Sequence, residues 1–458
     1  MTLQTLSPPN TAQLIARYDG RAPRYTSYPT AVQFTPAVTA EVYRQWLAEL
    51  PPADPVSLYL HVPFCARLCW YCGCNTRAVN SHQPIGDYVN LLLAELDMLS
   101  DALPGRLKAS AVHLGGGTPN MLTPEELGEI FDALKHAFRF SGDMEIAAEL
   151  DPAVLTRDWV RAAASHGLSR ASLGVQNLDD RVQAAVNRKD TIAEIQAGVG
   201  WLRDAGVASI NLDLMYGLPH QTVENTLRTL DAILPLQPER LALFGYAHVP
   251  WMKAHQKLIH EAALPDAAER LDQSEAAAER LLSEGYVPIG LDHFALPTDA
   301  LAVAAFEGTL HRNFQGYTTD AAGTLLGLGA SAIGSLPQGF VQNAAQETTW
   351  RAAVGAHELP IARGVALTDD DRFRGEIIER LMCDFDVDLA AICARHHRAL
   401  SDLAEPLARL EAFERDGLIR HEGVRLMITE RGRILVRSVC ATFDAYLAPD
   451  AQRHAKAI

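Results

Sequence analysis

The strongest constraint on the fold is a regular alternation of short β-branched runs with amphipathic helical stretches, which begins near residue 56. Six runs have the composition of strands: 56–62, 110–115, 144–150, 170–175, 208–215 and 241–247. Alternation of this kind predicts an α/β fold, a parallel sheet with right-handed crossovers. Six units are too few for a closed eight-stranded barrel. We therefore expect a partial (β/α)6 TIM-like barrel with its site at the carboxyl ends of the strands.

The segments that flank this repeat have different patterns. The N-terminal part contains the Pro- and Tyr-rich stretch PRYTSYPTA (23–31), which indicates an extended arm. After about residue 360, helical patterns lead into two short strands around Glu422-Gly423 and a last helix, which favours a winged-helix-like module. We predict an arm (1–50), a barrel with C-terminal extension strands (51–360) and a mostly helical, winged-helix-like C-terminal domain (361–458).

Composition and charge exclude several classes of function. The 458 residues carry a net charge of -16, which is unsuited to general binding of nucleic acid or membrane surfaces. An anionic ligand would therefore need a local set of cations. We find no secretory pattern and no apolar run long enough for a membrane span. Seven cysteines, four of them close together, do not form a secreted disulfide framework, so we expect a cytoplasmic protein.

The stretch CARLCWYCGC (65–74) concentrates four cysteines in ten residues. The Cys-x3-Cys-x2-Cys spacing at Cys65, Cys69 and Cys72 suits a loop around one corner of an iron–sulfur cube, with three thiolates on three irons and the fourth iron open. Zinc is the competing interpretation, since four thiolates can close a tetrahedral site, although such sites usually join two ligand pairs by a longer loop. The spacing resembles that of the radical S-adenosylmethionine (SAM) enzymes, in which SAM chelates the open iron.

Polar or glycine-rich positions recur at the ends of the expected strands. GGGTP (115–119) follows the second strand, Glu149 ends the third, and Gln176 follows the fourth; Asp213 ends the fifth, and Ala247 follows the sixth. In a parallel barrel all of these face one rim, which indicates a ligand site there. Glycines allow close approach of the backbone to a ligand, so GGGTP suits either a tight turn or a loop that binds the methionine end of SAM.

Further motifs follow one another along the chain: HVPFCARLCWYCGCN, HLGGGTPN, EIAAELDP, SLGVQNLD, NLDLMYGLP, GYAHVP, LDHFA, LHRNFQGYTT and LGLGASAIG. With the arm, they resemble the oxygen-independent coproporphyrinogen III oxidases of haem biosynthesis, from about residue 16 to 448. The resemblance implies an enzyme that decarboxylates the ring A and B propionates of coproporphyrinogen III to vinyls, by way of a 5′-deoxyadenosyl radical. The product would be protoporphyrinogen IX.

The resemblance also implies the cofactor sites. Cys65, Cys69 and Cys72 would hold one 4Fe–4S cluster, and the protein would bind two SAM molecules. The cluster-bound SAM would contact Tyr59, Gly116, Glu149 and Ile333. The second SAM would contact Tyr71, Gly117, Thr118, Gln176, Arg188, Asp213 and Ala247. From the residues alone, the alternative is that Glu149 and Asp213 are plain charges at strand ends and that Arg188 is a surface charge.

Two residues beside the cysteine motif are candidates for proton or hydrogen handling. Cys74 extends the motif to CxxxCxxCxC, as in the oxidases, whereas a related branch of haem chaperones lacks this fourth cysteine. His61 ends the first expected strand. A buried filler cysteine and a satisfied structural histidine are the alternatives. At the level of function, the alternative is a haem chaperone on the same fold that binds haem without oxidase activity.

The substrate that the resemblance implies has four propionates, so an acidic protein needs local cations to bind it. Arg24 in the arm and His311-Arg312 in LHRNFQGYTT are our candidates, because arginine binds carboxylates with two parallel hydrogen bonds. We also expect the arm to act as a lid, with Tyr25 and Tyr28 flanking the macrocycle. The alternative is that these residues only pack or face solvent.

The chain does not supply an obvious electron donor of its own, and this predicts a partner protein. The remaining cysteines, Cys383, Cys393 and Cys440, are too widely spaced to hold a second cluster, so we expect an external flavodoxin- or ferredoxin-like electron donor. No coiled-coil pattern demands a dimer, and we expect a monomer. A winged helix can bind DNA, but the net acidity argues against nucleic acid as a partner.

Overall fold

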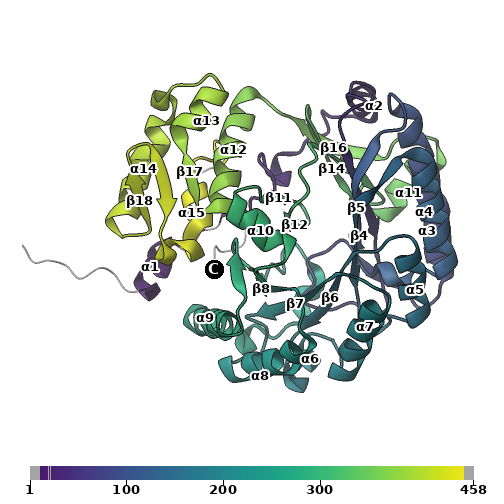
Figure 1. The fold of residues 1–458 in the computed structure, drawn as a ribbon, viewed down its shortest axis with the longest axis horizontal. Coiled ribbons are helices and arrows are strands. Elements are labelled where there is room, and N and C mark those ends of the chain that lie inside the picture. Colours follow the sequence, from purple (N-terminus) through teal and green to yellow (C-terminus); the bar gives the residue numbers. More distant parts are fainter. Residues whose placement is uncertain (1–10, 19, 21, 448–458) are drawn as a thin grey trace, which may run out of the picture.

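A curved sheet of twelve strands organises the computed structural model, which describes residues 11–18, 20 and 22–447 (Figure 1). The order of the strands is β16-β15-β14-β13-β1-β4-β5-β6-β7-β8-β10-β9. The six predicted strands form its parallel centre: β1 (Val56–Val62), β4 (Lys108–Gly116), β5 (Arg139–Leu150), β6 (Arg170–Gln176), β7 (Ser209–Tyr216) and β8 (Arg240–Gly245). The expected α/β partial barrel is thereby confirmed.

Helices cover the outer face of this sheet, as the ring around it in Figure 1 shows. They are α3 (Gln83–Ala102), α4 (Pro124–Ala137), α5 (Arg157–Ser165), α6 (Asp180–Ala185), α7 (Ile192–Asp204), α8 (Val223–Ile233) and α9 (Ala267–Ser283). Capping boxes begin α4 at Thr123 and α7 at Thr191, so each crossover returns to the sheet at a defined residue. Among the described residues, no helix is long and apolar enough to cross a membrane.

The two edges of the sheet are extended by strands that the repeat does not predict. Next to β1, β13 (Thr324–Leu328) adds a further parallel strand. Beyond it the antiparallel strands are β14 (Ile333–Leu336), β15 (Gly339–Asn343) and β16 (Ile361–Ala366), and at the other edge β10 (His293–Ala295) and β9 (Val287–Ile289). The intervening elements are α10 (Ala300–Glu307), β11 (His311–Asn313), β12 (Gly316–Thr318) and α11 (Glu347–Gly355). The sheet thus continues to Ala366, slightly past the predicted boundary at 360.

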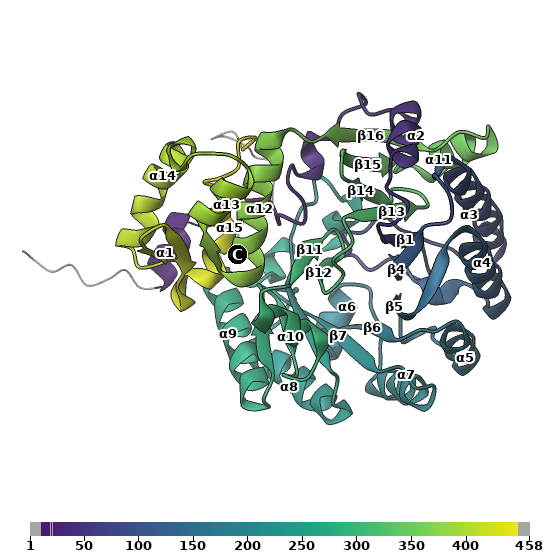
Figure 2. The same ribbon diagram turned by 45° about the horizontal axis from the view of Figure 1, so that its top comes forward.

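The C-terminal region lies beside the open side of the curved sheet, and β11 and β12 lie between the two (Figures 1 and 2). It contains α12 (Asp369–Asp384), β17 (Asp386–Asp388), α13 (Leu389–Arg395), α14 (Ala404–Arg415), β18 (Ile419–Glu422), β19 (Arg425–Ile428) and α15 (Val436–Cys440). The hairpin around Glu422-Gly423 is present, with β17 as a third strand. The last helix is shorter than expected, because the Asp444 carboxylate binds Tyr25 and the Tyr446 N–H and holds the chain in turns.

The N-terminal arm is only partly extended. Helices α1 (Thr11–Tyr18) and α2 (Ala40–Ala48), which the sequence analysis did not predict, flank the Pro- and Tyr-rich stretch. The N-cap Thr39, whose hydroxyl accepts a hydrogen bond from the Val42 N–H, is the local signal for α2. The stretch between the helices packs into the C-terminal core, where Tyr25 and Tyr28 are buried. The arm therefore packs as part of the C-terminal region, although it lies at the other end of the sequence.

Candidate active site

The cysteine loop follows β1 at the carboxyl rim of the sheet. It begins in β2 (Phe64–Cys65) and ends at β3 (Arg77–Ala78), and these two short strands pair in parallel. Each of the three thiols of the motif has a polar neighbour. The sulfur of Cys65 lies 3.0 Å from the Thr76 hydroxyl, that of Cys69 lies 3.6 Å from an Arg188 nitrogen, and that of Cys72 accepts the Cys74 N–H at 3.4 Å.

The chemistry of this donor set fits an iron–sulfur cluster. All of the cysteines are free thiols, and three of them share one loop of eight residues, 65–72. Among the described residues, no group of three or more His, Cys, Asp or Glu side chains is arranged to hold a single metal ion. An iron–sulfur cube needs no such convergence, because each thiolate binds a different iron.

The four thiols differ in their acidity. Burial raises the pKa of Cys65 and of Cys69, since both sulfurs are largely screened from water. A hydrogen bond between the thiols of Cys72 and Cys74 lowers the pKa of Cys72 to about 7 and raises the pKa of Cys74 well above its ordinary value. In this pair Cys72 is the better thiolate ligand, and Cys74 is the donor that supports it.

A second loop, residues 247–256, contacts backbone carbonyls of the cysteine loop. The sequence analysis did not identify it. Lys253 donates to the carbonyl of Cys74 at 3.0 Å, His255 contacts the carbonyl of Cys72 at 2.7 Å, and Gln256 donates to that of Tyr71 at 3.0 Å. Gln256 is fully buried. No local motif marks these residues, because their partners lie about 180 positions away in the chain.

The glycine-rich stretch at the end of β4 is a place of close approach. Gly116 has φ +108°, and a Cβ there would lie 2.5 Å from the His61 ring. A Cβ on Gly117 would lie 2.7 Å from the Phe64 carbonyl oxygen. Thr118 follows, with its hydroxyl 3.4 Å from the sulfur of Cys65. Only glycine fits at the first two positions, so the turn packs closely against the cysteine loop, and the N–H groups of Gly117 and Thr118 donate to the carbonyls of Val62 and Phe64.

Glu149 stands across this turn at the end of β5. Its carboxylate accepts the Gly116 N–H at 3.1 Å and lies 3.3 Å from the His113 ring nitrogen, while Tyr59 stacks on that ring. Burial alone would raise the pKa of Glu149, but the hydrogen bonds from His113 and from Gly116 outweigh it and lower that pKa. Its side chain is still 40% exposed, so an ionised carboxylate faces open space. A carboxylate of this kind suits an ammonium group.

A separate polar set surrounds Arg188 and Tyr71. The Arg188 guanidinium donates to the Tyr71 hydroxyl at 2.9 Å and to the Gly174 carbonyl at 2.8 Å, and it pairs with Asp190. Gln176 lies at the adjoining bulge with φ +62°. The sequence analysis expects Arg188 to meet a ligand; in the structure the arginine is buried and joins the cysteine loop to β6.

Asp213 is held on β7 by its neighbours. Its carboxylate accepts hydrogen bonds from the Ser172 hydroxyl at 2.7 Å and from Asn211 at 2.8 Å. Burial raises the pKa of Asp213. Ala247 follows β8, and its carbonyl accepts from Gln256 at 3.3 Å. Ile333 begins β14 on the far side of β1. The residues predicted to bind the cofactors are therefore distributed from β14 to the end of β8.

His61 has both ring nitrogens occupied. Its Nδ1 accepts from the Tyr59 hydroxyl at 3.0 Å, and its Nε2–H donates to the carbonyl of Asn75 at 2.8 Å, because a carbonyl can only accept. The residue is buried, and burial lowers the pKa of His61. These contacts favour the alternative of a satisfied structural histidine, whose ring positions the loop after β1.

The residues expected to bind substrate divide into two groups. Arg24 and Arg312 line a cavity of about 990 Å³ beside the ends of β7 and β8. Tyr25 and Tyr28 do not, because their rings lie in the C-terminal core and their hydroxyls bind Asp444 and the Ala445 N–H. The expectation that these rings flank a macrocycle is therefore corrected. His311 pairs with Glu379 at 3.1 Å and does not line the cavity either.

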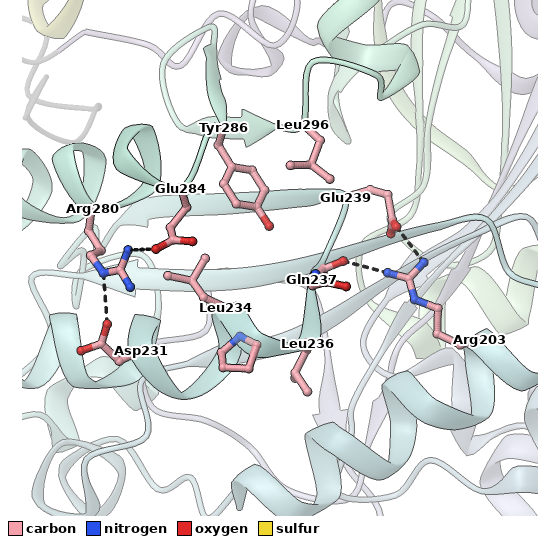
Figure 3. Close-up of a pocket in the computed structure, with 11 residues that line it drawn as sticks. Arg203, Asp231, Leu234, Leu236, Gln237, Glu239, Arg280, Glu284, Tyr286 and Leu296 are labelled. Atoms are coloured by element: carbon pink, nitrogen blue, oxygen red, sulfur yellow. Dashed lines mark hydrogen bonds and ion pairs between the residues drawn. The ribbon is translucent and has the colours of Figure 1, made fainter.

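A further cavity, of about 780 Å³, lies at the opposite end of the strands (Figure 3). Its arginines are already paired. Arg280 binds Asp231 and Glu284, and Arg203 binds Glu239 at 2.7 Å. This end of a parallel sheet is also the one that rarely carries catalytic groups. We assign no ligand to it.

Comparisons with known proteins agree with this geometry. Residues 59–233 match the family model of the radical SAM superfamily, and residues 367–435 match that of the HemN C-terminal domain. A fold of this type, with the three-cysteine loop after its first strand, defines a radical SAM enzyme, which implies a 4Fe–4S cluster and SAM as cofactors.

Comparison with individual relatives assigns the chain to one family within this superfamily. It is 49% identical over 448 residues to the oxygen-independent coproporphyrinogen III oxidase of Bradyrhizobium diazoefficiens, covering 98% of this chain and 100% of that one. It is 43% identical to the enzyme of that name from Cereibacter sphaeroides, covering 96% and 97%. The solved coproporphyrinogen III oxidase of Escherichia coli, a radical SAM enzyme, matches with a TM-score of 0.90 and 36% identity over 96% of this chain and 100% of that one. The chain belongs to the oxygen-independent coproporphyrinogen III oxidase family.

Proposed function

We propose that this protein catalyses the anaerobic oxidative decarboxylation of the ring A and B propionates of coproporphyrinogen III to vinyls, giving protoporphyrinogen IX. One observation carries the proposal: the cysteine loop of a radical SAM enzyme stands at the rim of the sheet, next to a cavity lined by arginines. The radical chemistry needs the loop, and a tetracarboxylate substrate needs the cations. Family membership supports the same activity.

We propose that Cys65, Cys69 and Cys72 hold the cluster and that two SAM molecules bind at the rim. When bound, the cluster and SAM supply a carbon radical that can remove a hydrogen atom from the substrate. The two separate polar sets support the count of two. One set surrounds the ionised Glu149 and the glycine turn at Gly116, and the other surrounds Arg188. The residues of the first site are Tyr59, Gly116, Glu149 and Ile333, and those of the second are Tyr71, Gly117, Thr118, Gln176, Arg188, Asp213 and Ala247.

Electrons have to come from outside the chain in this proposal. Cys383, Cys393 and Cys440 are buried in apolar clusters of the C-terminal region, which supports a separate flavodoxin- or ferredoxin-like donor. We further propose a cytoplasmic monomer, because seven free thiols suit a reducing compartment. The arm, barrel and C-terminal domain remain our proposed division of the chain.

The direct test is an anaerobic assay of the reconstituted protein. Coproporphyrinogen III, SAM and dithionite are added, and protoporphyrinogen IX and 5′-deoxyadenosine are measured together. We expect both products. Deoxyadenosine without a vinyl product would show that the substrate is another molecule. Stoichiometric haem binding without loss of propionates would replace the oxidase with a haem chaperone.

A matched pair of variants separates the roles of two neighbouring cysteines. Cys72→Ser should lose the cluster, because it removes one of three iron ligands. Cys74→Ser should keep about four irons per chain and the formation of deoxyadenosine, and lose the vinyl product. Iron analysis and product analysis of both variants check this. Loss of iron from Cys74→Ser would make Cys74 a ligand of the cluster or a necessary support for one.

A further inference from the structure

Arginines from three distant parts of the chain meet in the 990 Å³ cavity beside β7 and β8. Arg24 comes from the arm, Arg312 from β11 and Arg437 from α15 of the C-terminal domain. Figures 1 and 2 both show β11 between the sheet and that domain. The cavity is also lined by other charged side chains: Arg270, Arg431, Arg433, His248, Asp266, Glu275, Asp292 and Glu430.

Arg24, Arg312 and Arg437 concentrate positive charge in one part of the cavity. Arg437 is buried, and burial together with the charge of Arg24 lowers its pKa to about 10; Arg312 acts in the same direction. The carboxylate that faces these cations in the described structure is Asp292, which already binds His293 at 2.7 Å. Of the other acids, Glu430 pairs with Arg433 at 3.1 Å and Asp266 caps α9. Three guanidinium groups thus line one sheltered cavity, and this concentration of positive charge suits an anionic ligand.

Arg312 adds a second, independent observation. Its Nε and Nη1 atoms are inaccessible to water and have no hydrogen-bond partner in the described structure. Its remaining nitrogen donates to the Arg24 carbonyl at 3.4 Å, and its guanidinium lies over the Tyr317 ring at 4.3 Å. Buried donors without acceptors cost free energy, so the site is completed when a ligand supplies the acceptors. Each of these two N–H groups can donate to a carboxylate oxygen.

The arginines lie along the rim from the start of the cysteine loop at Cys65. That loop follows β1 and packs on the end of β4, whereas Arg24 contacts the Gly245 carbonyl at the end of β8. Four strand steps separate β4 from β8, which is roughly 19 Å along the curved sheet. Carboxylates bound at the arginines therefore lie several strands along the rim from Cys65, whereas the other end of the cysteine loop reaches the cavity side through its contacts with loop 247–256.

Resting on the function proposed above, we infer that Arg24, Arg312 and Arg437 bind the two propionates that the reaction leaves intact. The C-terminal domain thereby completes the substrate site through Arg437. The macrocycle extends from this anchor across the rim, so that the opposite propionates reach the cysteine loop. The anchor sets which side of the ring faces the radical, and it gives an acidic protein the affinity for a tetra-anion.

The test is a binding titration of the reconstituted protein with two fluorescent porphyrins. Coproporphyrin III carries all four propionates, and mesoporphyrin IX carries only the two that correspond to those left intact. We expect Arg437→Gln and Arg312→Gln each to weaken binding of both porphyrins by about tenfold or more, and by the same factor, because charge-assisted hydrogen bonds to a carboxylate are lost. Arg437→Lys should restore part of the affinity.

Controls separate binding from folding. Arg420→Gln removes an exposed arginine of the same domain and should leave both affinities unchanged. Arg437 also donates to the Ala22 carbonyl, so melting temperatures are compared for all variants; Arg312→Gln removes two donors that have no protein partner. Weakened binding of coproporphyrin III alone would show that the arginines bind the reacting propionates, and unchanged binding of both would show that they bind none. Either outcome overturns the inference.

The same variants distinguish this inference from the proposed function. If the wild-type protein converts coproporphyrinogen III but both glutamine variants bind porphyrins normally, the function stands and the anchor is wrong. If the wild-type protein converts nothing, yet binds both porphyrins in a manner that depends on Arg312 and Arg437, the anchor stands and the oxidase proposal is wrong.

Discussion

At the scale of single residues, Arg188 decides whether the cysteine loop stays attached to the sheet. It joins Tyr71 of that loop to the Gly174 carbonyl on β6 and neutralises Asp190, and both charged side chains are buried. Arg188→Met should lower the free energy of unfolding by about 3–5 kcal/mol, because a buried carboxylate loses its partner. Iron incorporation should fall with it. Urea unfolding and iron analysis after reconstitution measure the two effects.

The matched control for this substitution is Arg157→Met. Arg157 forms an exposed pair with Asp204 at 2.8 Å, and loss of such a pair should change the stability by less than about 1 kcal/mol. Wild-type stability and iron content in Arg188→Met would contradict the role of Arg188 as the connection between loop and sheet.

The residues of the site differ in how far the sequence reveals them. The cysteines and the glycines at 116 and 117 can be found from the sequence, because each group forms a motif of residues close together in the chain. Three cysteines of one loop bind one cluster, and adjacent glycines let the backbone of one turn approach its neighbours closely. Gln256 and His255 are not, since the carbonyls that they bind belong to another loop. Tyr28 was misjudged for the same reason: an aromatic ring suits a ligand or a core equally, and its partner Ala445 lies 417 positions away.

At the scale of elements, the buried Glu95 of α3 connects that helix to the strands added beyond β13. Its carboxylate accepts hydrogen bonds from the Gly329 N–H at 2.9 Å, from Trp350 at 2.8 Å and from Asn343 at 2.6 Å. Burial raises the pKa of Glu95 from 4.5 to about 7 despite these donors. The folded protein therefore keeps this proton over a range of pH in which the unfolded chain has lost it.

The pH dependence follows from that difference. Below pH 4.5 Glu95 is protonated in both the folded and the unfolded protein, so its titration does not change the stability. Between pH 4.5 and about 7 Glu95 ionises in the unfolded chain alone, which progressively favours unfolding. The stability of the wild type relative to Glu95→Gln should fall by about 3 kcal/mol over this window. Urea unfolding of both proteins at several pH values measures it. A difference that stays constant with pH would contradict the prediction, and Glu129→Gln on α4 is the control for loss of an exposed charge.

The elements that the sequence predicts are those with a strong local signal. Strand β1 is buried almost throughout, so its β-branched run marks it without any context. Strand β13 is short, and its place in the sheet depends on parallel pairing with β1, from a distant part of the chain, and on antiparallel pairing with β14. The helices of the arm were missed because α2 is short and its pattern is weaker than that of the Pro- and Tyr-rich stretch beside it.

At the scale of the whole molecule, the arm makes the barrel and the C-terminal domain depend on each other. Leu14, Tyr25 and Tyr28 are buried in the C-terminal core, whereas Arg24 between them faces the cavity and contacts Gly245 of the barrel. The cysteine loop has its contacts within the barrel, at Thr118, Arg188 and Gln256. Loss of the arm should therefore affect the C-terminal domain and the substrate cavity and leave the cluster in place.

Deletion of residues 1–30 tests this arrangement. Removal of three buried side chains should cost the C-terminal domain roughly 5–9 kcal/mol, so calorimetry should show that domain unfolding before the barrel. Iron content should stay near that of the wild type, and turnover of coproporphyrinogen III should be lost with Arg24. Tyr28→Phe, which removes only the acceptor of the Ala445 N–H, should cost about 1 kcal/mol and keep turnover. Full turnover after the deletion would show that the barrel binds its substrate without the arm.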